Sequence, residues 1–136
     1  MNLRLLRPES PSDTPPQRRR WRDKFREAFR GIKLGVRGQS SFFVHFFAAT
    51  LVVVSATVLQ CDLIEWCILL GCIGLVTTAE LFNSAIETLF RGLDGPGRDK
   101  CFTALEIAAG AVLAASATSA VVGGIVLGRR VWQLFF

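Results

Sequence analysis

The sequence predicts an all-α integral membrane protein, in which an N-terminal amphipathic surface helix precedes three transmembrane helices. Of its 136 residues, 51% are hydrophobic and 20% are charged, and the charges are unevenly placed. Residues 1–41 hold eleven of the sixteen Lys and Arg and four of the eleven Asp and Glu, a net charge of +7, whereas residues 42–136 carry −2. The second part contains two uncharged runs, Phe42–Gln60 and Ile107–Gly128. Runs of about 18 or more such residues are typical of membrane spans. A soluble enzyme, a secreted disulfide domain and a disordered chain therefore fit poorly.

Residues 1–20 form a basic, proline-rich segment that we expect to be disordered. A basic arm can bind nucleic acid, but this one has no interleaved aromatic residues and no recognisable module, so no nucleic-acid partner is expected. Beside a membrane, such an arm favours the cytoplasmic side and its anionic headgroups. The four cysteines include no C-x-x-C pair and the chain has one histidine, which argues against a zinc site or a disulfide framework.

Residues 21–38 form the predicted surface helix. Its apolar residues recur at steps of three and four, and cations fill much of the remainder. This pattern indicates a helix that lies in the membrane interface. The apolar residues are Trp21, Phe25, Ala28, Phe29, Ile32 and Val36. The simpler interpretation of this helix is a membrane anchor.

The predicted spans are residues 42–60, 63–90 and 101–128, and residues 129–136 form a short C-terminal tail. Asp62 and Glu65 have the spacing of a capping box at the start of the second span. The third span is rich in Ala and Gly, which allow membrane helices to approach closely. Eleven cations before the first span and three in residues 91–100 place the N-terminus and the second loop in the cytoplasm. Arg129 and Arg130 then lie outside, in mild conflict with that rule.

Three polar residues interrupt the second span. At about 100° per residue, Glu80 and Glu87 fall within about 20° of the same direction, and Asn83 lies between them. Ionisable residues within a span are costly and indicate a function. One interpretation is a divalent-metal and proton-transfer site, which Glu106 of the third span would join at a similar depth. The alternative is an interhelical hydrogen-bond cluster that holds an oligomer together.

The chain has no P-loop. Gly92 and Gly97 have the required separation, but Arg98 and Asp99 stand where Lys and Ser or Thr should follow. Any nucleotide chemistry must therefore use carboxylates, a metal ion and Arg or Lys side chains.

The run Glu80–Glu87 resembles the E-x-x-N-[ST]-A-[IV]-E signature of the prokaryotic diacylglycerol kinase and undecaprenol kinase family. The segments 29–33, 42–45 and 107–113 resemble that family's surface helix, the entry to its first span and the start of its third span. The similarity covers about residues 21–128.

This resemblance implies a homotrimeric kinase of the bacterial inner membrane, with sites shared between subunits. It would transfer the γ-phosphate of ATP to a lipid hydroxyl with Mg²⁺, in phospholipid biosynthesis. Diacylglycerol is the first expected substrate, and undecaprenol is the alternative. The implied roles are general base for Glu80, substrate positioning for Asn83, Phe42 and Lys33, metal binding for Glu87 and Gln39, and nucleotide binding for Arg20, Gln39, Glu87, Arg98 and Glu106.

Three positions depart from the family pattern. Gln39 stands where an acidic metal ligand is usual, Leu105 replaces a phosphate-facing Lys, and Arg91 replaces an acidic residue. Arg98, Lys100 or Arg20 are the cations that would replace the missing Lys. The departures motivate a further alternative, a catalytically impaired family member that acts as a membrane assembly or lipid-binding protein. A channel or transporter subunit fits worse, because the signature lies at the cytoplasmic edge of its span.

Overall fold

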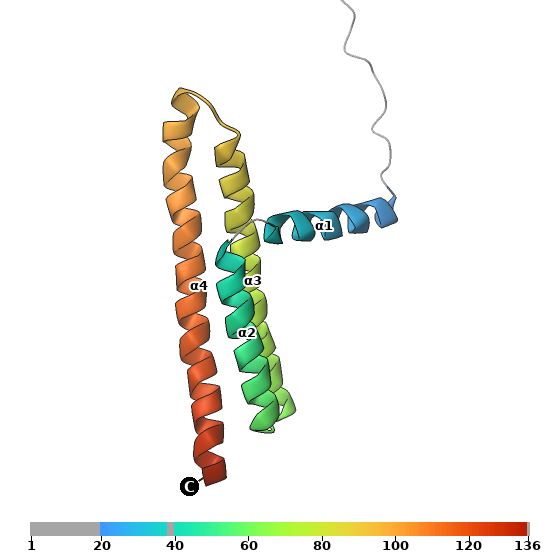
Figure 1. The fold of residues 1–136 in the computed structure, drawn as a ribbon, viewed down its shortest axis with the longest axis vertical. Coiled ribbons are helices and arrows are strands. Elements are labelled where there is room, and N and C mark those ends of the chain that lie inside the picture. The colour runs from blue at the N-terminus through green and yellow to red at the C-terminus, as the bar shows by residue number, and fades with distance from the viewer. Residues whose placement is uncertain (1–19, 38–39, 136) are drawn as a thin grey trace, which may run out of the picture. The chain divides into compact units, whose positions relative to one another are not determined.

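The computed structural model describes residues 20–37 and 40–135, and this part of the chain is helical (Figure 1). Gln39 and almost all of the predicted disordered segment lie outside the described residues. The helices are α1 (Trp21–Val36), α2 (Ser40–Val58), α3 (Leu63–Arg91) and α4 (Pro96–Phe135). The last three are long and apolar enough to cross a membrane. The predicted fold class is therefore confirmed.

Helix α4 is longer at both ends than the predicted span 101–128. It begins at Pro96, a residue type favoured at the first position of a helix, directly after Gly95, whose φ is 72°. It continues through the residues assigned to a C-terminal tail and ends at Phe135. At about 1.5 Å per residue, its 40 residues extend over about 60 Å, well beyond the hydrocarbon core of a bilayer.

The chain divides after Gly31 into two compact units, which are described separately. In the first unit, Lys24 lies 5.0 Å from the ring centroid of Trp21, and Arg26 pairs with Asp23 at 3.4 Å. Trp21, Phe25 and Phe29 are all more than 60% exposed. Because nothing described covers this apolar face, α1 has the character of an interfacial helix.

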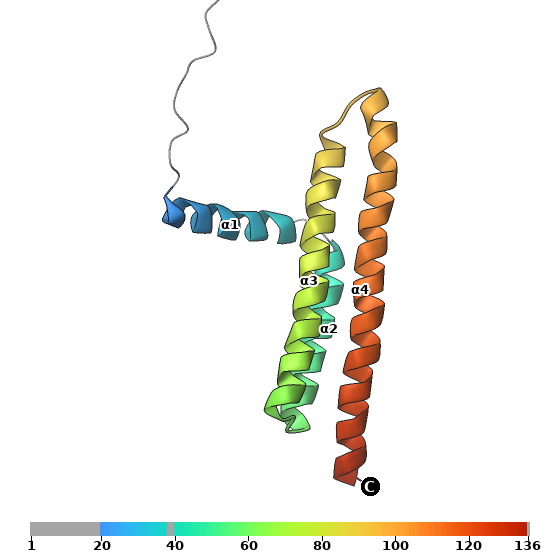
Figure 2. The same ribbon diagram turned by 180° about the vertical axis from the view of Figure 1, so that it is seen from behind.

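In the second unit, α3 runs antiparallel to α2, and α4 runs antiparallel to α3, as both views show (Figures 1 and 2). The α3–α4 pair makes the most extensive contact. Gly123 faces Leu69 across this pair: a Cβ at Gly123 would lie 3.7 Å from the Leu69 side chain. Ala108, Ala115 and Gly123, spaced by seven and eight residues, are buried on one face of α4. The small residues therefore allow the close approach that the sequence predicts.

The bundle has a small interior and a large apolar exterior. Among the residues that the structure describes, five hydrophobic ones are buried: Phe42, Ala56, Leu69, Ala108 and Ala115. Phe43, Phe47 and Leu113 are more than 70% exposed. The hydroxyls of Thr50 and Thr57 donate hydrogen bonds to backbone carbonyls of their own helix, at 2.9 and 2.8 Å. A surface of this kind, apolar and with its polar groups satisfied within each helix, suits contact with lipid.

The turn between α2 and α3 is fixed by a capping box and by α4. The Glu65 amide donates to the Asp62 carboxylate at 2.9 Å, and the Asp62 amide donates to the Glu65 carboxylate at 2.8 Å. This confirms the predicted capping box. Arg130 of α4 donates to the carbonyls of Leu59 and Gln60, and its Nε lies 3.8 Å from Glu65.

Candidate active site

Glu80 lies in the C-terminal half of α3 and is 2% exposed. His45 of α2 faces it, with Nε2 3.6 Å from Oε1 of Glu80. A carboxylate removed from water is costly unless a partner compensates its charge. The imidazole is the group that α2 places toward this carboxylate. The pair therefore joins α2 and α3 at the depth of the signature.

Asn83 and Ser84 continue this polar surface along α3 by one turn. Asn83 Oδ1 and Ser84 Oγ are buried, and neither has a hydrogen-bond partner among the described residues. Most buried polar atoms in proteins have one, and an unsatisfied atom costs about 1–3 kcal/mol. The two atoms are therefore available to a group outside the described chain, such as a ligand or a second subunit.

Glu87 lies near the end of α3 and is less enclosed, with its side chain 25% exposed. Arg91 Nη2 lies 2.5 Å from Glu87 Oε1, an i, i+4 pair on one helix face. Arg91 also complements the partial negative charge at the helix C-terminus. Arg91, which stands where the family pattern has an acidic residue, thus supplies a cation that neutralises Glu87.

The antiparallel register of α3 and α4 determines what faces the signature. Ser119 Oγ donates to the Cys72 carbonyl at 3.3 Å, and the rings of Phe90 and Phe102 lie 6.1 Å apart. Glu87 precedes Phe90 by three residues on α3, and Leu105 follows Phe102 by three residues on α4. Because the two helices are antiparallel, Leu105 lies level with Glu87. Glu106 is therefore near the level of Glu87 and about two turns from Glu80 along the axis. It is exposed.

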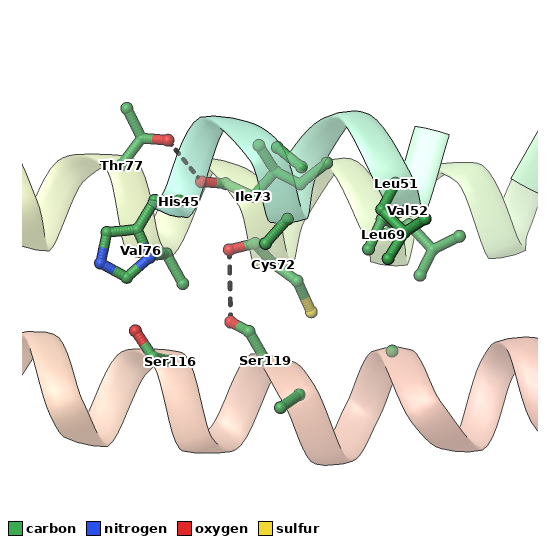
Figure 3. A pocket seen from close by; sticks show the side chains of 14 residues that line it. His45, Leu51, Val52, Leu69, Cys72, Ile73, Val76, Thr77, Ser116 and Ser119 are labelled. Carbon is green, nitrogen blue, oxygen red and sulfur yellow. Dashed lines mark hydrogen bonds between the residues drawn. The ribbon is translucent and has the colours of Figure 1, made fainter. Parts of the chain in front are cut away.

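An apolar groove of about 380 Å³ begins beside His45 and runs between α2, α3 and α4 (Figure 3). Figure 3 shows the imidazole beside Val76, with Ser116 across the groove on α4. The opposite end of the groove reaches Leu69 and Gly123. Thr77 follows Leu69 by eight positions on α3, so the groove follows the helix for about 12 Å. An enclosed carboxylate and a hydrocarbon-lined groove thus meet at His45.

Comparison with known proteins assigns this arrangement to a family. The family model described as prokaryotic diacylglycerol kinase matches residues 26–127, which include Glu80, Asn83 and Glu87. The chain belongs to this family. A protein of Synechocystis sp. named diacylglycerol kinase is 32% identical over 104 residues, which cover 76% of this chain and 59% of that relative. The chain thus spans about three fifths of the relative's length. No solved structure shows a significant match to the chain.

The structure brings some of the residues implied by the family together. Glu80 and Asn83 lie on adjacent turns of α3, and Glu87 follows one turn later. Phe42 is 8% exposed and lies one turn before His45 on α2, toward the level of Asn83 in the antiparallel register.

The described residues to which the resemblance assigns nucleotide binding, and Lys33, to which it assigns substrate positioning, are not gathered in the same way. Arg98 is exposed, with its guanidinium 5.1 Å from the ring centroid of Phe90. Lys33 and Arg20 are exposed, and Arg20 belongs to the separate first unit.

The donor set fits Mg²⁺ shared with a phosphate ligand. Within residues 20–37 and 40–135, no three acidic, His or Cys side chains are close enough to hold a metal ion by themselves. Mg²⁺ in phosphoryl-transfer sites commonly takes only one or two carboxylates, with substrate phosphates and water as further ligands. Glu87 has the chemistry to be such a carboxylate.

His45 is the residue of this site to which the sequence reasoning assigned no role. It is the single histidine of the chain and stands in the segment 42–45 that resembles the family. These two facts are the features of the sequence that could have indicated a role for His45. Its pairing with Glu80 depends on the register of α2 against α3, which local sequence does not determine.

Proposed function

We propose that the protein is an ATP- and Mg²⁺-dependent lipid kinase that phosphorylates the hydroxyl of a membrane lipid, with diacylglycerol as the first substrate and phosphatidic acid as the product. The observation that carries the proposal is the buried Glu80 carboxylate facing His45, which lines one end of an apolar groove. The groove suits an acceptor whose hydroxyl is joined to a hydrocarbon chain. Membership of the diacylglycerol kinase family supports the same chemistry.

In the proposed step, Glu80 accepts the proton of the lipid hydroxyl. The hydroxyl oxygen bonds to the γ-phosphorus of ATP, the bond from that phosphorus to the β–γ bridging oxygen breaks, and ADP leaves. Asn83, which follows Glu80 by one turn of α3 and has a buried oxygen without a partner among the described residues, positions the reacting groups. Phosphoryl transfer depends mainly on such positioning and on charge neutralisation.

Glu87, together with Gln39, would hold the Mg²⁺ that neutralises the phosphate charge. Arg98, Glu106 and Arg20 are the proposed nucleotide-binding residues, and Lys33 and Phe42 position the substrate.

Purified protein in vesicles, supplied with γ-labelled ATP and one lipid at a time, tests this function. We expect labelled phosphatidic acid with diacylglycerol and no product when Mg²⁺ is chelated. Labelling of undecaprenol alone would replace diacylglycerol by the alternative substrate. Labelling of neither lipid would favour the impaired family member that only binds lipid or assembles in the membrane.

We propose a homotrimer with active sites shared between subunits. Two observations on the described residues support a site completed by a neighbour: Asn83 and Ser84 have unsatisfied buried atoms, and no three acidic, His or Cys side chains lie close together. Mixing the inactive variants Glu80→Gln and Glu87→Gln tests the sharing. Activity of the mixture would show that Glu80 and Glu87 of one site come from different subunits, whereas a mixture as inactive as its components would show that one subunit supplies both carboxylates.

We propose that the N-terminus lies in the cytoplasm of a bacterium whose inner membrane holds the protein. The contacts of Arg130 with the α2–α3 turn support this orientation, because they give a structural reason for one of the two cations that conflict with it. A membrane-impermeant thiol reagent applied to intact cells should then reach Cys61, which lies in that turn.

A further inference from the structure

The contact of His45 with Glu80 assigns His45 a place at the reaction centre. The imidazole Nε2 faces Glu80 Oε1 at 3.6 Å, and the Glu80 side chain is 2% exposed against 24% for His45. The carboxylate thus has almost no water on it, so its direction depends on the protein groups around it. A base must point one oxygen at the hydroxyl whose proton it takes.

His45 lies between the Glu80 carboxylate and the apolar groove, and this position indicates what the residue does. One side of the ring meets the carboxylate, and the residue also forms the end of the apolar groove beside Val76 (Figure 3). An acceptor lipid whose tail follows the groove brings its hydroxyl to this end. His45 therefore lies where the base and the hydroxyl must be aligned.

We propose that His45 is a positioning residue of the lipid kinase, and that its Nε2–H donates to Oε1 of Glu80 so that Oε2 receives the proton of the lipid hydroxyl. This inference rests on the proposed function. The distance of 3.6 Å is longer than a hydrogen bond. Catalytic hydrogen bonds are often long before substrate binds and shorten in the complex. The proton taken from the lipid stays on Glu80 and leaves to water after the product departs.

The chemistry of His45 predicts which substitutions it tolerates. A glutamine side chain can place an amide N–H near the position of Nε2, whereas asparagine reaches only the position of Nδ1. Leucine provides similar bulk with no donor. The three variants therefore separate donation at Nε2 from packing between α2 and α3.

The test measures kcat, and KM for ATP and for lipid, in vesicles for His45→Leu, His45→Gln and His45→Asn. Thr50→Val is the matched control, since Thr50 is exposed on the same helix and its hydroxyl donates to its own backbone at 2.9 Å. We expect His45→Leu and His45→Asn to lower kcat about 10- to 100-fold with KM for ATP unchanged, the loss typical of a misplaced reacting group. His45→Gln should stay within a few-fold of wild type, and Thr50→Val should match it.

Wild-type kcat in His45→Leu, or an equal loss in His45→Gln and His45→Asn, would overturn the inference. If His45→Leu does not fold, as judged by its oligomer and its unfolding temperature, the comparison of Gln with Asn decides alone. Failure of the proposed function looks different, because the wild-type protein itself would then phosphorylate neither lipid.

Discussion

The two ends of the helix bundle both contain carboxylates and cations, but they use them differently. At the α2–α3 turn, the Asp62 carboxylate caps α3 and the Glu65 carboxylate accepts from the Asp62 amide, while Arg130 donates to the carbonyls of Leu59 and Gln60, which follow α2. Around the signature, Glu80 meets His45 only at 3.6 Å, and buried oxygens of Asn83 and Ser84 have no partner among the described residues. The first cluster is satisfied within the chain, and the second is not.

This difference separates stabilising from functional polar groups. A satisfied cluster contributes its hydrogen bonds to stability, and substitution of a member removes that contribution. An unsatisfied cluster costs stability and persists where a ligand or a partner uses it. Substitutions at the signature should therefore change activity more than stability, and substitutions at the α2–α3 turn should do the reverse.

The largest expected effect is that of Glu80→Gln. Glutamine retains the shape of the side chain but cannot accept the lipid proton, so we expect the rate to fall about 10²–10⁴-fold, the usual contribution of a general base. Initial rates of lipid phosphorylation measure the loss. A rate within a few-fold of wild type would show that Glu80 is not the base.

Asn83→Ala should have the next largest effect on activity. We expect a loss of about 10- to 100-fold, because the reacting groups lose a positioning contact. The unfolding temperature should change little, since the buried Oδ1 that is removed has no partner among the described residues. A clearly lower unfolding temperature with normal kcat would show that Asn83 serves the fold instead.

Arg130→Met tests the opposite end of the bundle. It removes the donor from Leu59 and Gln60 and the cation from Glu65, which should cost about 1–3 kcal/mol of unfolding free energy. Arg129→Met is the matched control, because the neighbouring Arg129 is exposed. Thermal unfolding in detergent should show a lower transition for Arg130→Met alone. Equal transitions for the two variants would remove the assigned role of Arg130.

The smallest expected effect concerns the Cys61 thiol in the α2–α3 turn. Partial burial, followed by the nearby Glu65 charge, raises the pKa of Cys61 above its ordinary 9.0. A raised pKa keeps the thiol protonated, so alkylation at pH 8 should be slow and should accelerate with pH. Glu65→Gln, which retains the capping-box geometry, should lower the pKa and speed alkylation. The rate is followed with the other three cysteines replaced by alanine, and no change would contradict the assigned contact.

The sequence was sufficient for features that depend on local structure. Hydrophobic runs predicted the three spans, and the spacing of Asp62 and Glu65 predicted the capping box because both partners lie within one turn. Contacts across helices were not predictable in this way. The pairing of His45 with Glu80 and the binding of Arg130 to the α2–α3 turn depend on how the helices are aligned. The extension of α4 through residues 129–135 was missed because two arginines there suggested an end of the span.

Glu80→Gln and Arg130→Met, compared in one experiment, test the central claim that the two ends of the bundle have separate roles. Each variant is reconstituted with diacylglycerol. The rate at which the variant phosphorylates the lipid is measured per folded protein, and the unfolding temperature of the variant is measured in the same preparation. We predict that Glu80→Gln unfolds at or above the wild-type temperature with its rate lost, and that Arg130→Met unfolds earlier with a wild-type rate. The reverse result, an active Glu80→Gln of lowered stability beside an inactive Arg130→Met of normal stability, would contradict the claim.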